Sequence, residues 1–262
     1  MILTEENYYS PEADIEYCSA SQFKSFFWTQ GMEGCEAKTM AKIKGYWKEE
    51  PSAAMILGSY IDAHFEGTLD VFKAKHPEIY TKKGELLAAF KDAEKMIGRC
   101  EKDEYFMKFL SGQKQKIFTA NIFGINWKCK LDSYLPGIAI VDLKSTRNIV
   151  DKSWNIDYTK KISFVEAYGY DIQLALYQKI VAQNYKVNLP CYIAAVSKES
   201  EPDIEIIAFE QETLDLAMGH VESLASRLID LKSGKEQPKR CEKCDYCRAS
   251  KKLTKPKLLR YL

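Results

Sequence analysis

The sequence lacks several features that would place a protein in a common class. No apolar run approaches the length of a membrane-spanning helix, and the N-terminus does not follow the pattern of a secretory signal peptide. Internal repeats and low-complexity linkers are also absent. A phosphate-binding Walker loop is missing too, because Gly234-Lys235 lacks the upstream glycine and the following Ser or Thr. We therefore expect no membrane partner and a cytoplasmic location.

Histidine is scarce, with three residues, whereas cysteine is plentiful, with eight. In a chain without a secretion signal, so many cysteines indicate metal ligation or ordinary burial rather than a disulfide framework.

Charge is unevenly distributed along the sequence. Residues 232–260 hold eleven Lys or Arg against three Asp or Glu, so the remainder carries a net charge of minus seven within a total of +1. This basic tail fits either an anionic partner such as nucleic acid or a merely solvated segment.

Hydrophobic periodicity predicts a mixed α/β protein with a helical N-terminal third. We expect a single domain over residues 1–234, made of a helical part (1–112) and a sheet-and-helix core (113–234), with a basic cysteine-containing tail (235–262) packed on it. The predicted strands form a three-strand meander followed by two further strands: 115–123, 125–134, 138–145, 191–196 and 204–209. The predicted core helices that flank this central sheet span 164–184 and 211–232.

One predicted hairpin, over residues 129–144, carries an unusual set of charges. Asp132 and Asp142 fall near each other across it, and Lys144 projects from the same strand face as Asp142. Such groups at the end of a buried strand are costly unless a charged species lies between them. Mg²⁺ prefers carboxylate and carbonyl oxygens, so these acids and the Leu143 carbonyl are candidate ligands. The alternative is a cross-strand ion pair on a surface hairpin.

The tail contains a second candidate metal site. Cys241, Cys244 and Cys247 follow a C-x2-C-x2-C spacing in a segment too polar to form a core, which favours thiolate ligation of a metal. A fourth ligand is needed. The remaining cysteines of the core, Cys100, Cys129 and Cys191, lie in periodic segments and are expected to be ordinary buried thiols.

Taken together, these residues resemble the PD-(D/E)xK nuclease superfamily. The matching residues are Asp132, then Asp142-Leu143-Lys144 on the following strand, then a Q-x3-Y pattern formed by Gln173 and Tyr177 on the next helix. That pattern is similar to the motif of the RecB-like and RecE-like branch, and phage or prophage RecE-type exonucleases are the most similar group. The resemblance covers roughly residues 19–250. Leu131 stands in place of the name-giving proline, and the second acid is Asp rather than Glu.

The resemblance implies a restriction-endonuclease-like fold and a divalent-metal-dependent DNA exonuclease. Mg²⁺ (or Mn²⁺) would be held by His64, Asp132, Asp142 and the Leu143 carbonyl. Lys144 would position the attacking water, and the residues of the Q-x3-Y motif would orient the phosphate or the other ligands. The implied partners are duplex DNA ends in phage-type recombination and a single-strand annealing protein. A homo-oligomeric ring is implied as well.

The resemblance also supplies a fourth cysteine. In the iron–sulfur branch of RecB-like nucleases, one cysteine before the core joins three after it. Cys35 fits that role with Cys18 in reserve, and the cofactor would be a 4Fe-4S cluster, with zinc as the alternative because the spacing is tight.

Ordinary structural roles remain open for three of these residues. His64 is also explained as a core histidine, and Gln173 and Tyr177 as a contact between helix and sheet. For the whole chain the alternative function is a catalytically idle nuclease-like module that binds DNA or a partner through its metal-stapled tail.

Overall fold

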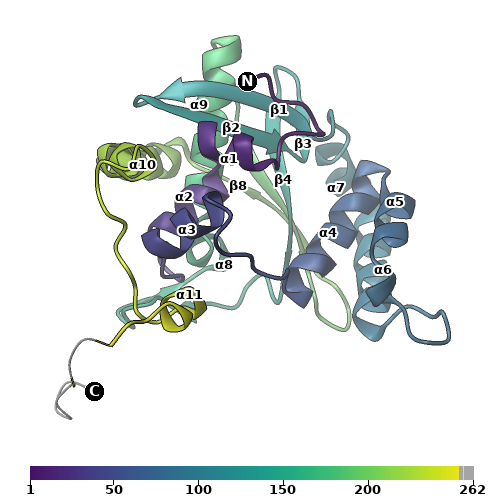
Figure 1. The fold of residues 1–262 in the computed structure, drawn as a ribbon. Coiled ribbons are helices and arrows are strands. Elements are labelled where there is room, and N and C mark those ends of the chain that lie inside the picture. Colours follow the sequence, from purple (N-terminus) through teal and green to yellow (C-terminus); the bar gives the residue numbers. More distant parts are fainter. Residues whose placement is uncertain (254–255, 257–262) are drawn as a thin grey trace.

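A mixed four-stranded sheet lies at the centre of the computed structural model, which describes residues 1–253 and 256. Its strand order is β3 (Ser133–Leu135), β4 (Ala139–Thr146), β7 (Cys191–Ser197) and β8 (Ile204–Ala208). Strand β4 pairs in parallel with β7, while β3 with β4 and β7 with β8 are antiparallel. A mixed central sheet with flanking helices is the α/β architecture that the sequence predicted (Figure 1).

The predicted three-strand meander is present but is divided between two sheets. Strands β1 (Lys116–Ile122) and β2 (Ile125–Leu131) form a separate antiparallel pair. Their two-residue turn, Phe123-Gly124, has positive φ at both positions, as a tight hairpin turn requires. Strand β3 continues directly from β2, but the pairing changes partner at Asp132. A carboxylate therefore stands where one sheet ends and the next begins.

Helices fill the N-terminal part of the chain, as predicted. Their bounds are α1 (Pro11–Glu16), α2 (Ala20–Phe26), α3 (Glu36–Ile43), α4 (Ala53–Glu66), α5 (Leu69–Lys75), the 3-10 helix η1 (Pro77–Ile79), α6 (Ala88–Glu101) and α7 (Glu104–Phe109). Ser19 and Ser52 cap α2 and α4 by accepting from backbone N–H groups. Neither α5 nor η1 was predicted from the sequence.

The parallel crossover from β4 to β7 contains a short hairpin and two helices. The hairpin strands are β5 (Ser153–Trp154) and β6 (Lys161–Ile162), and the helices are α8 (Phe164–Ala167) and α9 (Tyr170–Tyr185). A single helix over 164–184 was predicted, and that prediction is wrong at Gly169. This residue has a φ of 61°, and a Cβ there would lie 2.7 Å from Thr29 Cγ2. The left-handed backbone ends one helix and starts the next.

Two hydrophobic cores cover the two faces of the sheet. Helices α2, α9 and α10 (Gln211–Lys232) pack on one face, and α4, α6 and α7 pack on the other (Figure 1). Strand β4 serves both cores, because Ile140 belongs to the first and Val141 and Leu143 to the second. Asp142 shares the face of Ile140 and therefore projects toward α9.

The C-terminal segment returns to the N-terminal part of the chain. Its helix α11 (Asp245–Ala249) contacts α3, and the Arg227 guanidinium on α10 donates to both oxygens of Glu36 on α3. The Lys239 N–H donates to the same carboxylate over 2.7 Å. The rest of the predicted basic tail, residues 254–255 and 257–262, lies outside the described residues.

No helix in the described part of the chain combines the length and the apolar character that crossing a bilayer requires.

Candidate functional site: a cleft of acids and lysines

Asp132 occupies the point where β2 gives way to β3. Its Oδ2 accepts a hydrogen bond of 2.9 Å from the Leu143 N–H on β4. The pairing of β3 with β4 ends at Ser133 and Val141. The Asp132 carboxylate therefore accepts the hydrogen bond from Leu143 N–H that a backbone carbonyl would accept if β3 were longer. The split between the two sheets thus anchors a carboxylate beside an open edge of β4.

Asp142 is almost fully buried, with 3% of its surface exposed, and it is oriented from α9. Gln173 Nε2 donates to Asp142 Oδ1 over 2.8 Å. The Lys24 ammonium on α2 in turn donates to Gln173 Oε1 over 3.1 Å, which fixes the direction of the amide. Burial, with the neighbouring charge of Lys144, lowers the pKa of Lys24 to about 8, although Asp142 and Asp171 oppose the shift.

Lys144 lies at the centre of the acids. Its Nζ is 2.5 Å from Asp142 Oδ2 and donates to the Leu143 carbonyl over 3.0 Å. Burial alone would lower the pKa of this ammonium, but the charges of Asp142 and Asp132 outweigh it and raise the pKa above the ordinary lysine value. Lys144 is therefore a permanent cation.

A third carboxylate, Asp62 on α4, completes the cluster. Burial raises the pKa of Asp62 to about 7; Lys144 opposes the shift, and the charges of Asp142 and Glu66 add to it. Burial and the neighbouring Asp142 likewise raise the pKa of Asp132 well above its usual value. Burial is therefore the main reason why these two carboxyl groups hold their protons more tightly than usual, and the charges of the neighbouring acids add to it.

The structure does not bring His64 to this cluster, so the expectation that it lies there is wrong. Its Nε2 is 2.8 Å from Glu101 Oε1 on α6, and its ring packs edge-on against Phe65. Two residues along a helix correspond to a rotation of about 200°, so Asp62 and His64 cannot face the same way. Asp62, unlike His64, lines the cavity with the other acids.

Sequence reasoning missed Asp62, Glu66 and Lys24. The i, i+4 spacing of Asp62 and Glu66 places two acids on one face of α4, opposite the apolar Tyr60, and that spacing was a usable signal. Lys24 gave no comparable signal, because its side chain reaches the cleft only through the packing of α2 against α9.

The acids and lysines line a cavity of about 1080 Å³. The predicted residues Asp132, Asp142, Lys144, Gln173 and Tyr177 all line it, whereas His64 does not. Burial and the charge of Asp142 raise the pKa of the Tyr177 hydroxyl well above its usual value, so this group stays neutral. Several further lining residues are basic or aromatic: Tyr8, Tyr9, Lys42, Lys128, Lys130 and Tyr170.

The cleft supplies carboxylate oxygens, the donor type that a hard divalent cation prefers. Asp142 Oδ2 is buried, and the Lys144 ammonium lies 2.5 Å from it. Three carboxylates, those of Asp62, Asp132 and Asp142, act on this one ammonium, so their combined formal charge exceeds its own. Oxygen donors of this kind suit Mg²⁺ and Mn²⁺.

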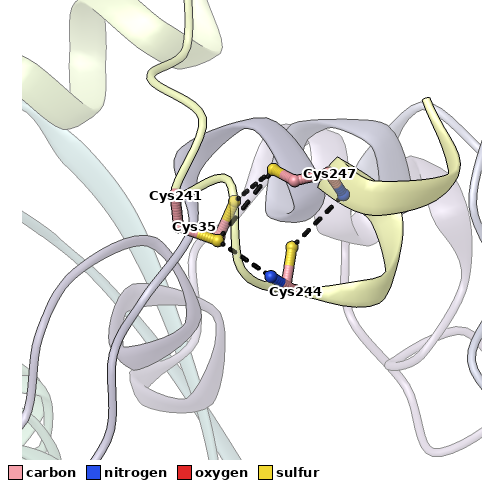
Figure 2. A group of neighbouring side chains, drawn as sticks. All are labelled: Cys35, Cys241, Cys244 and Cys247. Atoms are coloured by element: carbon pink, nitrogen blue, oxygen red, sulfur yellow. Dashed lines mark hydrogen bonds between the residues drawn. The ribbon is translucent and has the colours of Figure 1, made fainter. Parts of the chain in front are cut away.

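Four cysteines form a separate cluster where the C-terminal segment packs against the start of α3 (Figure 2). The sulfur atoms of Cys35, Cys241, Cys244 and Cys247 all lie within 4.8 Å of one another. Cys35 Sγ is 3.6 Å from Cys247 Sγ, and Cys241 Sγ is 3.9 Å from Cys247 Sγ. Cys35 immediately precedes α3. Its sulfur lies with those of the three tail cysteines, as the prediction of a fourth cysteine required.

Backbone N–H groups point at these sulfur atoms, as at a thiolate site. Cys244 N donates to Cys241 Sγ over 3.3 Å, and Cys247 N donates to Cys244 Sγ over 3.5 Å. Although burial raises it, the pKa of the Cys241 thiol is lowered to about 7 by the backbone N–H groups of Cys244 and Lys243. The reserve residue, Cys18, lies elsewhere, in the main core.

Comparison with known proteins gives matches over the whole chain. The family described as a PDDEXK-like domain of unknown function (DUF3799) matches residues 19–250. A crystal structure from Eubacterium rectale, named as a "putative exonuclease", is 50% identical, with a TM-score of 0.97 and coverage of 100% of this chain and 98% of that chain.

A second solved structure, of SSO0001, covers 74% of this chain and 85% of that chain, but 9% identity and a TM-score of 0.29 support no conclusion. No curated protein matches the chain. The family match spans the same residues, 19–250, as the resemblance seen in the sequence.

Proposed function

The chain belongs to the family of PDDEXK-like domains, and we propose that it is a divalent-metal-dependent DNA exonuclease. The family match and the 50% identical relative support a nuclease. The observation that carries the proposal is the convergence of Asp132, Asp142 and Lys144 on one cavity, with Asp62 beside them.

The residues that would hold Mg²⁺ or Mn²⁺ are Asp62, Asp132, Asp142 and the Leu143 carbonyl. Asp62 replaces His64 in this proposal, because the histidine side chain is paired with Glu101. When bound, such an ion lowers the pKa of a coordinated water and neutralises charge on the phosphate.

The side chains of the cleft then have distinct tasks. The permanent cation Lys144 orients the attacking water and offsets negative charge that develops on the phosphate. Gln173, fixed by Lys24, keeps Asp142 aimed at the cavity. The water oxygen forms the new bond to phosphorus, the bond from phosphorus to one sugar oxygen breaks, and that oxygen leaves with a proton.

We further propose a RecE-type role on duplex DNA ends in phage-type recombination. Its support is the Q-x3-Y motif of Gln173 and Tyr177 on the cleft wall. A single-strand annealing partner and a ring-shaped homo-oligomer belong to the same proposal.

For the four cysteines we propose a single zinc ion. A tetrahedral Zn²⁺ with bonds of about 2.3 Å separates its sulfur ligands by about 3.8 Å. The sulfur pairs at 3.6 Å and 3.9 Å match that spacing. A 4Fe-4S cluster binds each thiolate to a different iron atom and would hold the sulfurs farther apart.

The test of the nuclease is cleavage of linear duplex DNA with Mg²⁺, beside the same DNA as a closed circle. Wild-type protein should degrade the linear form and spare the circle, and Asp132→Asn should abolish degradation. Equal degradation by the wild type and Asp132→Asn would overturn the proposal. Cleavage of the circle would replace the exonuclease by an endonuclease.

Asp62→Asn and His64→Asn form a matched pair on one helix. Asp62→Asn should lose Mg²⁺-dependent cleavage and His64→Asn should keep it. Salt-sensitive DNA binding without any cleavage by the wild type would favour the catalytically idle module instead.

A further inference from the structure

Two adjacent tyrosines of the N-terminal segment form part of the cleft wall. Tyr8 is buried, with 5% of its surface exposed, whereas Tyr9 is 72% exposed, and both line the cavity that holds the acids. Their rings meet edge-on with centroids 4.9 Å apart. An exposed aromatic face at the entrance of a cleft is not explained by the packing of the core.

The Tyr8–Tyr9 segment is held in place by a buried lysine. Lys128 on β2 is 1% exposed and donates to the Tyr8 carbonyl over 2.5 Å and to Asp14 Oδ1 over 2.8 Å. Its Nζ also lies 4.7 Å from the Tyr8 ring centroid. The main chain before Tyr9 is therefore fixed, and the Tyr9 ring is presented to the cavity at little further cost in entropy.

Lys130 brings a free positive charge to the same place. Its side chain lies on the same face of the strand as those of Lys128 and Asp132, because the three residues are spaced two apart along β2 and the residue that follows it. All three residues line the cavity. Its Nζ is 4.8 Å from the Tyr9 ring centroid. Among the described residues it forms no ion pair, in contrast to Lys128.

We propose that Tyr9 and Lys130 form a subsite for an unpaired terminal nucleotide of DNA. The base stacks on the exposed face of Tyr9, and Lys130 contacts the phosphate that leads toward Asp132. Stacking on a protein aromatic requires a base that has left its own stack, and every base offers the π-face that the ring needs. The subsite therefore selects frayed or single-stranded ends and is indifferent to sequence.

This inference rests on the proposed nuclease function, and binding in the absence of metal tests it separately. The probe is a short single-stranded oligonucleotide whose terminal base is the fluorescent analogue aminopurine, mixed with the protein in EDTA. Stacking on Tyr9 should quench the fluorescence in wild-type protein and in Tyr9→Phe. Tyr9→Ala should lose the quenching and bind the oligonucleotide about tenfold more weakly.

Two matched controls keep the test specific. Tyr105, which is 64% exposed on α7 and does not line the cavity, supplies Tyr105→Ala, which should behave as wild type. Lys130→Gln should lower the slope of log Kd against log salt concentration by about one, and Lys179→Gln, an exposed position on α9, should leave it unchanged.

Failure of the inference and failure of the proposed function give different results. Quenching that persists in Tyr9→Ala, in a protein that still cleaves linear DNA, would overturn the subsite alone. A wild-type protein that neither binds the oligonucleotide nor cleaves DNA would overturn both.

Discussion

The acidic cleft and the cysteine cluster both gather potential metal ligands from distant parts of the chain, but the surroundings of those ligands differ. The cleft acids lie on α4, at the junction of β2 and β3, and on β4, within the two main cores. The cysteines lie on a five-residue helix and two loops, in a small cluster formed with Ala37 and Tyr246.

This difference assigns different tasks to the two sites. The protein itself already supports the cleft acids, through the Leu143 N–H, the Gln173 amide and the Lys144 ammonium. We expect the cleft to keep its fold without metal and to need the ion for chemistry. The cysteine segment has little core of its own, and we expect its fold to depend on the metal.

The largest expected effect is on catalysis at Lys144. Lys144→Met keeps the stem of the side chain and removes the charge, and it should lower kcat by about a hundredfold to a thousandfold. Initial rates on linear duplex DNA at saturating Mg²⁺ measure the change. Lys42→Met is the matched control, because Lys42 lines the same cavity but pairs with Glu49. An equal decrease of kcat in both variants would contradict a catalytic role that is specific to Lys144.

Next in size is the pH dependence of stability in metal-free protein. The pKa of Asp62 is raised to about 7, against about 3.9 in an unfolded chain. Its contribution to stability is complete below about pH 4 and is lost as the pH rises through about 7. Asp62→Asn should therefore raise Tm by several degrees at about pH 8 and change it little at about pH 4.

Thermal melts in EDTA measure this effect, with His64→Asn as the control on the same helix. Added Mg²⁺ should shrink the advantage of Asp62→Asn, because the ion compensates the same charge. A variant no more stable than wild type at about pH 8 would contradict the raised pKa of Asp62.

A smaller effect is expected at Lys24, which acts through Gln173. Lys24→Met releases the amide that aligns Asp142, so kcat should fall about tenfold with KM little changed. If Lys24 affects catalysis only through the Gln173 amide, the double variant Lys24→Met/Gln173→Leu should have the same kcat as Gln173→Leu alone. Additive losses would mean that Lys24 acts on the substrate directly.

Local patterns in the sequence predicted the hairpin, helix α10 and the three tail cysteines as a set, whereas the joining of Cys35 to them was implied by the family resemblance. The hairpin was visible because Pro136 and Gly137 interrupt apolar strands, and the cysteines because their spacing is too regular for a polar loop. The position of Asp62 rather than His64 on the cleft wall was not predicted, because it depends on which face of α4 packs on the sheet. Lys24 and the subsite at Tyr9 depend on contacts between distant segments, which periodicity does not record.

The smallest expected effect on cleavage comes from the cysteine cluster. Cys244→Ser should lose a stoichiometric zinc ion, measured by elemental analysis, yet slow cleavage by less than about tenfold. Some loss is expected because α3 follows Cys35 and carries Thr39 and Lys42 on the cleft wall.

Cys18→Ala should keep the metal, since Cys18 lies in the main core. A brown protein absorbing near ~400 nm would replace zinc by an iron–sulfur cluster. Complete loss of cleavage in Cys244→Ser would show that the two sites are not independent.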